Sequence, residues 1–87
     1  MSFKVKLHPK VTKFLDKTEQ QVSDKIRKRL QILKCDNPFH YLEHYEGEKC
    51  YKFRASNHRA LIDVDIKQKI VFVRYLNHKS KIYKRAK

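Results

Sequence analysis

Length and charge restrict the function of this chain. It has 87 residues, with 22 Lys or Arg against nine Asp or Glu, a formal net charge of +13 and a pI near 10.0. A chain of this length is expected to form a single domain, spanning residues 1–87. The excess of positive charge predicts an anionic partner: a nucleic acid, an acidic protein or a membrane surface.

A membrane is the weakest of these three partners. No apolar stretch approaches the ~20 residues of a spanning helix, and the opening MSFKVKLHPK has no apolar core of a signal peptide. We therefore expect a cytoplasmic protein without a membrane partner. In that compartment Cys35 and Cys50 are expected to be reduced thiols, because two cysteines are too few for a disulfide framework.

The first half of the chain predicts one strand and two helices. Residues 3–7, FKVKL, alternate apolar and basic side chains and indicate a half-buried strand. Pro9 then suits the first turn of a short amphipathic helix. Thr18 followed by Gln21 fits a capping box that would begin a second helix, ending before Pro38. Its apolar residues recur at spacings of four, four and three: Val22, Ile26, Leu30 and Leu33.

The second half changes to a period of two, which is typical of strands. Residues 41–47 predict a short strand before a turn at Gly47, residues 50–55 and 58–66 a hairpin, and residues 70–76 a last strand. A basic tail follows. The expected fold is α+β: an N-terminal strand, a helical hairpin, then an antiparallel meander of three to four strands with the helices on one face.

The hairpin has a defined register if Ser56 and Asn57 are its two turn residues. Arg54 then faces Arg59 across the two strands. Alternation sends one set of side chains toward the helices: Tyr51, Phe53, Ala60, Ile62 and Val64. The opposite set lies on the open face: Lys52, Arg54, Arg59 and Asp63.

Three cations on one sheet face need an explanation. Like charges directly opposite each other destabilise a sheet, and Asp63 is the nearest acid that the pattern offers. Any one of these cations could be an ordinary solvated residue, but the three together favour a face built for a polyanion. With the basic tail beside it, the face is suited to RNA, offering charges for phosphates and an aromatic ring for a base. The tail residues that we expect to bind RNA are Lys81, Lys84 and Arg85.

The order of these segments resembles a known family. LHPK after the first strand, a helical hairpin, CYKFRASNHRALIDVD and IVFVRYLNHKSKIY are similar to RelE-type toxins of the RelE/ParE superfamily, and to archaeal RelE in particular. The resemblance implies a RelE-like microbial ribonuclease fold and the toxin of a type II toxin–antitoxin system. It also implies a ribosome-dependent mRNA endoribonuclease, or mRNA interferase, that uses no cofactor and no metal. In the implied reaction, the ribose 2′-OH of the mRNA attacks the neighbouring phosphate and leaves a 2′,3′-cyclic phosphate or the derived 3′-phosphate.

The same resemblance implies partners and site residues. The partners are an acidic RelB-like antitoxin, bound in a hetero-oligomer, together with mRNA in the ribosomal A site and rRNA. The family's catalytic positions fall on Lys52, Arg54, Arg59, Lys79 and Tyr83, and His78 lies where some members carry a histidine.

Elementary chemistry agrees with only part of this assignment. An in-line attack needs a base for the 2′-OH, cations for the equatorial oxygens and an acid for the 5′-oxygen. Arg59 and Lys52 suit the cation role. Arg54 occupies a position where better-known members have lysine, and a guanidinium is a poor base. Lys52 and His78 remain open as alternative bases.

Two other functions stay open at this stage. One is a non-enzymatic inhibitor of DNA gyrase, as in ParE-like toxins; the other is an RNA- or ribosome-binding domain without catalysis. His40 and His44 are four residues apart, but no further ligand completes a zinc pattern. The tyrosines at 41, 45, 51 and 75 are expected to pack in the core or an interface.

Overall fold

The computed structural model describes residues 2–44 and 50–81. Two helices follow the first strand: β1 (Lys4–Leu7), α1 (Pro9–Lys17) and α2 (Gln20–Gln31). A 3₁₀ turn, η1 (Pro38–Tyr41), leads into the short β2 (Glu43–His44), and three longer strands complete the chain: β3 (Tyr51–Ala55), β4 (His58–Asp65) and β5 (Ile70–His78). Residues 79–81 are helical. The predicted turn at Gly47 and the tail residues Tyr83, Lys84 and Arg85 lie outside the described residues.

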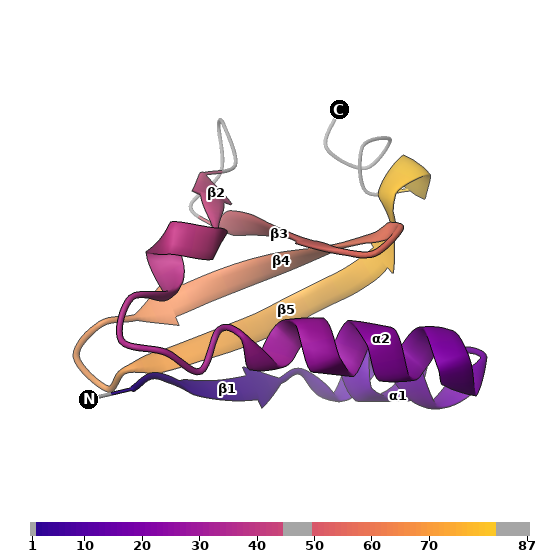
Figure 1. Ribbon diagram of the computed structural model, residues 1–87, viewed down its shortest axis with the longest axis horizontal. Coiled ribbons are helices and arrows are strands. Elements are labelled where there is room, and N and C mark those ends of the chain that lie inside the picture. Colours follow the sequence, from indigo (N-terminus) through magenta and orange to yellow (C-terminus); the bar gives the residue numbers. More distant parts are fainter. Residues whose placement is uncertain (1, 45–49, 82–87) are drawn as a thin grey trace.

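The strands form one five-stranded sheet in the order β1-β5-β4-β3-β2 (Figure 1). Strands β2 to β5 are an antiparallel meander, which confirms the predicted α+β fold with four meander strands. β1 adds to the other side of β5 in parallel, with Val5 opposite Val71. The sequence pattern predicted the first strand, but this long-range pairing depends on how the helical hairpin returns the chain.

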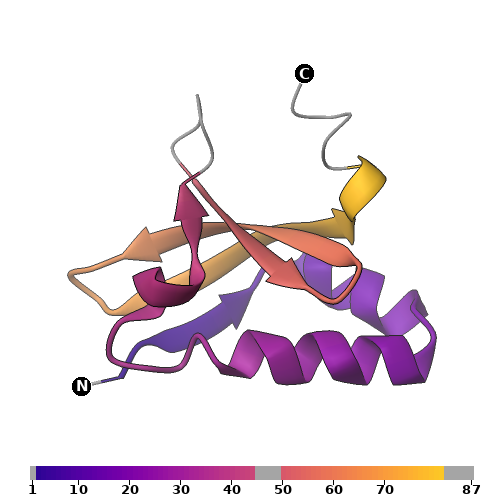
Figure 2. The ribbon, with the colours of Figure 1, turned by 45° about the horizontal axis from the view of Figure 1, so that its top comes forward.

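Both helices cover one face of the sheet, and within residues 2–44 and 50–81 neither helix covers the other face, which we call the open face (Figure 2). The core lies between these two layers because the helices direct their apolar stripes at the inward side chains of the strands. Its largest buried side chains include Val11, Leu15, Ile26, Phe53, Ile62 and Val73. In the part of the chain that the structure describes, neither helix is long and apolar enough to cross a membrane.

The predicted capping box at the start of α2 is wrong. The helix begins at Gln20, and its N-cap residue is Glu19, whose side chain makes no capping bond. Thr18 instead ends α1, where its hydroxyl donates to the Phe14 carbonyl at 2.7 Å. Only Thr18 and Glu19 separate the two helices, so the Thr18 hydroxyl is near both helix ends, and it bonds to the one that precedes it. Leu33 lies beyond the end of α2 and is nevertheless buried.

Candidate functional site

The β3–β4 hairpin has the predicted register. Ala55 pairs with His58, Arg54 with Arg59 and Phe53 with Ala60. Ser56 makes the tight connection with a positive φ of 60°. Phe53 and Ala60 are buried against the helices, so alternation carries both arginines to the open face.

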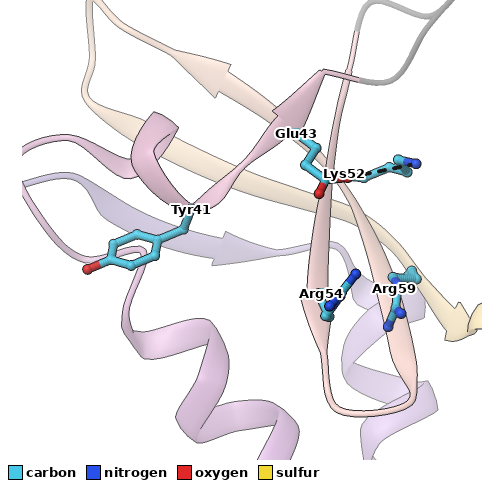
Figure 3. A pocket seen from close by; sticks show the side chains of 5 residues that line it. All are labelled: Tyr41, Glu43, Lys52, Arg54 and Arg59. Carbon is cyan, nitrogen blue, oxygen red and sulfur yellow. Dashed lines mark ion pairs between the residues drawn. The ribbon is translucent and has the colours of Figure 1, made fainter.

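The three predicted cations of the hairpin line one shallow hollow on this face (Figure 3). Its volume is ≈ 50 Å³, and its lining residues are Tyr41, Glu43, Lys52, Arg54 and Arg59. Such a volume holds only a few water molecules. A polyanion would therefore lie across the hollow, with single phosphate oxygens directed into it.

Hydrogen bonds hold the side chain of Arg59 and the main chain of Arg54. Nη1 of Arg59 donates to the carbonyls of His58 at 2.8 Å and Ser56 at 3.1 Å. These bonds fix the guanidinium beside the turn before any ligand arrives. The main chain at Arg54 is held from α2, because Nε of Arg29 donates to the Arg54 carbonyl at 3.2 Å. The Arg29 guanidinium also lies 5.4 Å from the ring centre of Phe53.

An acid does accompany the cations, and it is not the one that alternation suggested. Glu43 pairs with Lys52 across β2 and β3, with 4.0 Å between Oε2 and Nζ. Asp63, the acid expected nearest the cations, pairs instead with Arg74, 3.3 Å from Nε to Oδ2. Sequence analysis missed Glu43, because its place beside Lys52 depends on the pairing of β2 with β3, and no local pattern determined that pairing.

The expectation that Tyr41 packs in the core or an interface is not met within this chain. Its side chain is 43% exposed and lines the hollow. Tyr51 does pack as expected, with its ring 5.4 Å from that of Phe39.

The open face continues from the hollow onto β5. Arg59 pairs with Asn77, so Arg54, Arg59 and Asn77 form one row across three strands. The Asn77 amide nitrogen donates to the Tyr75 hydroxyl at 2.9 Å, and its oxygen accepts from the His78 backbone N–H at 2.7 Å. Sequence analysis missed Asn77, because the β4–β5 register shifts between Leu61 and Ile62 and no residue pattern indicated this irregularity.

The structure does not bring His78 into the hollow. His78 pairs with His58, and alternation directs both toward the helix side, opposite to Arg59 and Asn77. Their ring centres are 5.7 Å apart, and the His58 ring lies 5.6 Å from Phe14 of α1. Lys79 and Lys81 follow on the exposed helical turn, where the Lys79 N–H donates to the Asn57 carbonyl.

The imidazole of His58 is placed so that protonation is unfavourable. Burial lowers the pKa of His58 below its ordinary 6.5, and the charges of His78 and Arg59 lower it further. Within the described residues its buried Nδ1 has no hydrogen-bond partner. The folded state therefore binds a proton at this site less readily than the unfolded state does.

Acidification should consequently destabilise the fold through His58. The contribution of the neutral His58 ring to the free energy of unfolding is fully present above about pH 6.5. It is lost as the pH falls from there through the lowered pKa of the folded state. Thermal midpoints measured at pH 7.5 and pH 5 should differ less in His58→Gln than in wild type. The same change at the exposed His40 is the matched control, and an undiminished pH effect in His58→Gln would contradict the assignment.

Metal ligands do not gather in the described ranges 2–44 and 50–81. No group of three or more His, Cys, Asp or Glu side chains there could hold a metal ion.

Comparisons with known proteins find similarity in structure alone. No family model and no curated protein sequence matches the chain. The toxin–antitoxin complex RelBE2 of Mycobacterium tuberculosis contains a chain that aligns with a TM-score of 0.77 at 15% identity, covering 91% of this chain and 100% of that one. The archaeal RelE–RelB complex from Pyrococcus horikoshii aligns with a TM-score of 0.72 at 21% identity, covering 93% and 99%.

The isolated E. coli RelE toxin is also similar, with a TM-score of 0.71 at 19% identity over 97% of this chain and 94% of that chain. Nearly complete coverage in both directions means that the strand, the helical hairpin and the sheet all correspond. The chain therefore has the fold of the RelE toxins, as the sequence resemblance implied.

Proposed function

We propose that this chain is the toxin of a type II toxin–antitoxin system and acts as a ribosome-dependent mRNA endoribonuclease. The observation that carries the proposal is the hollow, which Lys52, Arg54 and Arg59 line together on the open face of a RelE-like fold. Opposing two arginines on neighbouring strands costs stability. Such an arrangement is reasonable where a phosphate backbone neutralises the charges during function.

The proposed reaction is an in-line attack of the ribose 2′-OH on the adjacent phosphorus. Negative charge grows on the equatorial oxygens as the new bond forms, and cations fixed in advance stabilise that charge most effectively. Arg59 is such a cation, because its Nη1 is already anchored at the turn. Lys52 and Arg54 complete the set from β3.

The basic turn after β5 extends the RNA-binding surface in this proposal. Lys79 and Lys81 are exposed next to the hairpin turn, where they would contact phosphates of mRNA or rRNA. Tyr83, Lys84 and Arg85 keep their proposed roles in catalysis and RNA binding, although they lie outside the described residues. His78 does not line the hollow, and its exposed ring lies 5.7 Å from that of His58; a catalytic role for it stays a prediction.

The proposed partner in the resting state is an acidic antitoxin in the cytoplasm. Four of the structural neighbours are complexes of a toxin with an antitoxin or an antitoxin peptide, and the net charge of +13 makes an acidic partner favourable. Co-expression with the protein encoded beside it should give a stable hetero-oligomer and remove toxicity.

Cleavage on a programmed ribosome tests the function directly. Purified protein should cut an mRNA positioned in the A site, with no divalent metal beyond what the ribosome requires, and primer extension should locate the cut. RNA binding without any product would instead favour a non-catalytic RNA-binding domain, and it would refute the nuclease proposal.

A further inference from the structure

We propose that Glu43 is the general base that takes the proton from the attacking 2′-OH. The inference rests on the proposed function and names the group that the family resemblance left undecided. Glu43 enters the hollow from β2, on the opposite side of β3 from Arg59 (Figure 3).

The lining of the hollow leaves few groups able to accept a proton. Arg54 and Arg59 are guanidinium ions, which retain their protons at any pH at which proteins fold. His78 is not among the residues that line the hollow, and its ring lies 5.7 Å from that of His58. A tyrosine hydroxyl such as that of Tyr41 is protonated at neutral pH. Glu43 and Lys52 therefore remain as the candidate bases among the described lining residues.

The ordinary chemistry of these two side chains separates their roles. An ionised carboxylate can only accept a proton, whereas an ammonium group can only donate one. Glu43, whose Oε2 lies 4.0 Å from Lys52 Nζ, is therefore the proton acceptor of the pair, and Lys52 supplies positive charge. Their exposure agrees, since the Lys52 side chain is 24% exposed and that of Glu43 is 73% exposed, leaving the carboxylate accessible to a ribose.

The proton and electron balance of the step is simple. The 2′-O–H bond breaks and its proton passes to a carboxylate oxygen of Glu43, while the ribose 2′-oxygen forms a bond to phosphorus. The bond from phosphorus to the 5′-oxygen breaks with its electron pair, and that oxygen takes a proton from water. The hydroxide so formed removes the proton from Glu43. The products are a 2′,3′-cyclic phosphate and a 5′-hydroxyl.

Glu43→Gln distinguishes the two candidate bases because the two assignments predict different cleavage rates for this variant. The rate should fall if Glu43 is the base, and it should stay the same or rise if Lys52 is the base. If Glu43 is the base, single-turnover cleavage on programmed ribosomes should fall by about 10²- to 10⁴-fold, and the decline of the wild-type rate at acidic pH should disappear from the residual activity. Affinity for ribosomes carrying mRNA with a 2′-deoxy scissile nucleotide should stay within a few-fold of wild type. Glu43→Asp keeps a carboxylate and should recover part of the rate.

Asp63→Asn supplies the matched control. Asp63 is a carboxylate on the same sheet, it pairs with Arg74 outside the hollow, and its loss should leave cleavage near the wild-type rate. A Glu43→Gln variant that cuts as fast as wild type, or faster with an optimum at lower pH, would make Lys52 the base and overturn the inference. Cutting by wild type in that experiment would leave the proposed nuclease function intact. Absence of cutting by wild type would overturn both.

Discussion

Replacement of Arg59 by alanine should lower the single-turnover rate of mRNA cleavage by up to roughly a thousandfold. Arg59 stands at the centre of the row Arg54–Arg59–Asn77. Its two bonds to turn carbonyls hold it in position, so its charge acts on the transition state without further ordering. Rates should be measured with saturating protein on programmed ribosomes, and Arg59→Lys should lie between the two because lysine keeps the charge but loses the planar fork.

Arg74→Ala is the control that separates a local effect from a loss of overall charge. Arg74 belongs to the same sheet and its guanidinium is paired with Asp63 outside the hollow. The two variants have equal net charge, yet only Arg59→Ala should lose cleavage. Equal rates in both variants, with thermal midpoints near wild type, would remove Arg59 from the proposed site.

The largest effect on stability is expected from Phe53→Ala. Phe53 is 1% exposed, lies in the middle of β3 and belongs to the core. Removing a buried aromatic ring of this kind costs about 3–5 kcal/mol of the free energy of unfolding, which is a large share of the stability of a small domain. Because Lys52 and Arg54 flank this residue, the loss should also disorganise the hollow.

Urea unfolding of wild type and Phe53→Ala would measure this difference. Ile66→Ala serves as the control, since Ile66 is 65% exposed and a change at such a surface position is usually worth less than about 0.5 kcal/mol. A Phe53→Ala variant no less stable than the control would mean that the two layers do not pack as described.

The register and the two faces of the β3–β4 hairpin could be predicted from local sequence patterns. Its register followed from a two-residue turn at Ser56 and Asn57, and a period of two then assigned Phe53 to the core and Arg54 to the open face. Both steps use only neighbouring residues, which is why they could be made without a structure. The α+β order of the elements followed from the same local periodicities.

The parts that could not be predicted depend on contacts between distant segments. Glu43 reaches Lys52 only because β2 pairs with β3, and no local pattern predicts the register of that pair. Asn77 reaches Arg59 through a strand pair with an irregular register, and the same pair carries His78 to the helix side. Thr18 was assigned to the wrong helix because a hydroxyl between two helices can bond to either helix end, and here it donates to Phe14 of α1.

A single 2′-deoxy substitution tests most directly the claim that the open-face hollow supports cleavage by 2′-OH attack. After the cut has been located by primer extension, the nucleotide on its 5′ side is replaced by its 2′-deoxy form in an mRNA that is otherwise identical. The account predicts that the protein cuts the all-ribose mRNA on programmed ribosomes, leaving a 2′,3′-cyclic or 3′-phosphate end detectable by mass spectrometry, and does not cut the substituted mRNA. Equal cutting of both mRNAs, or a 3′-hydroxyl end, would contradict it.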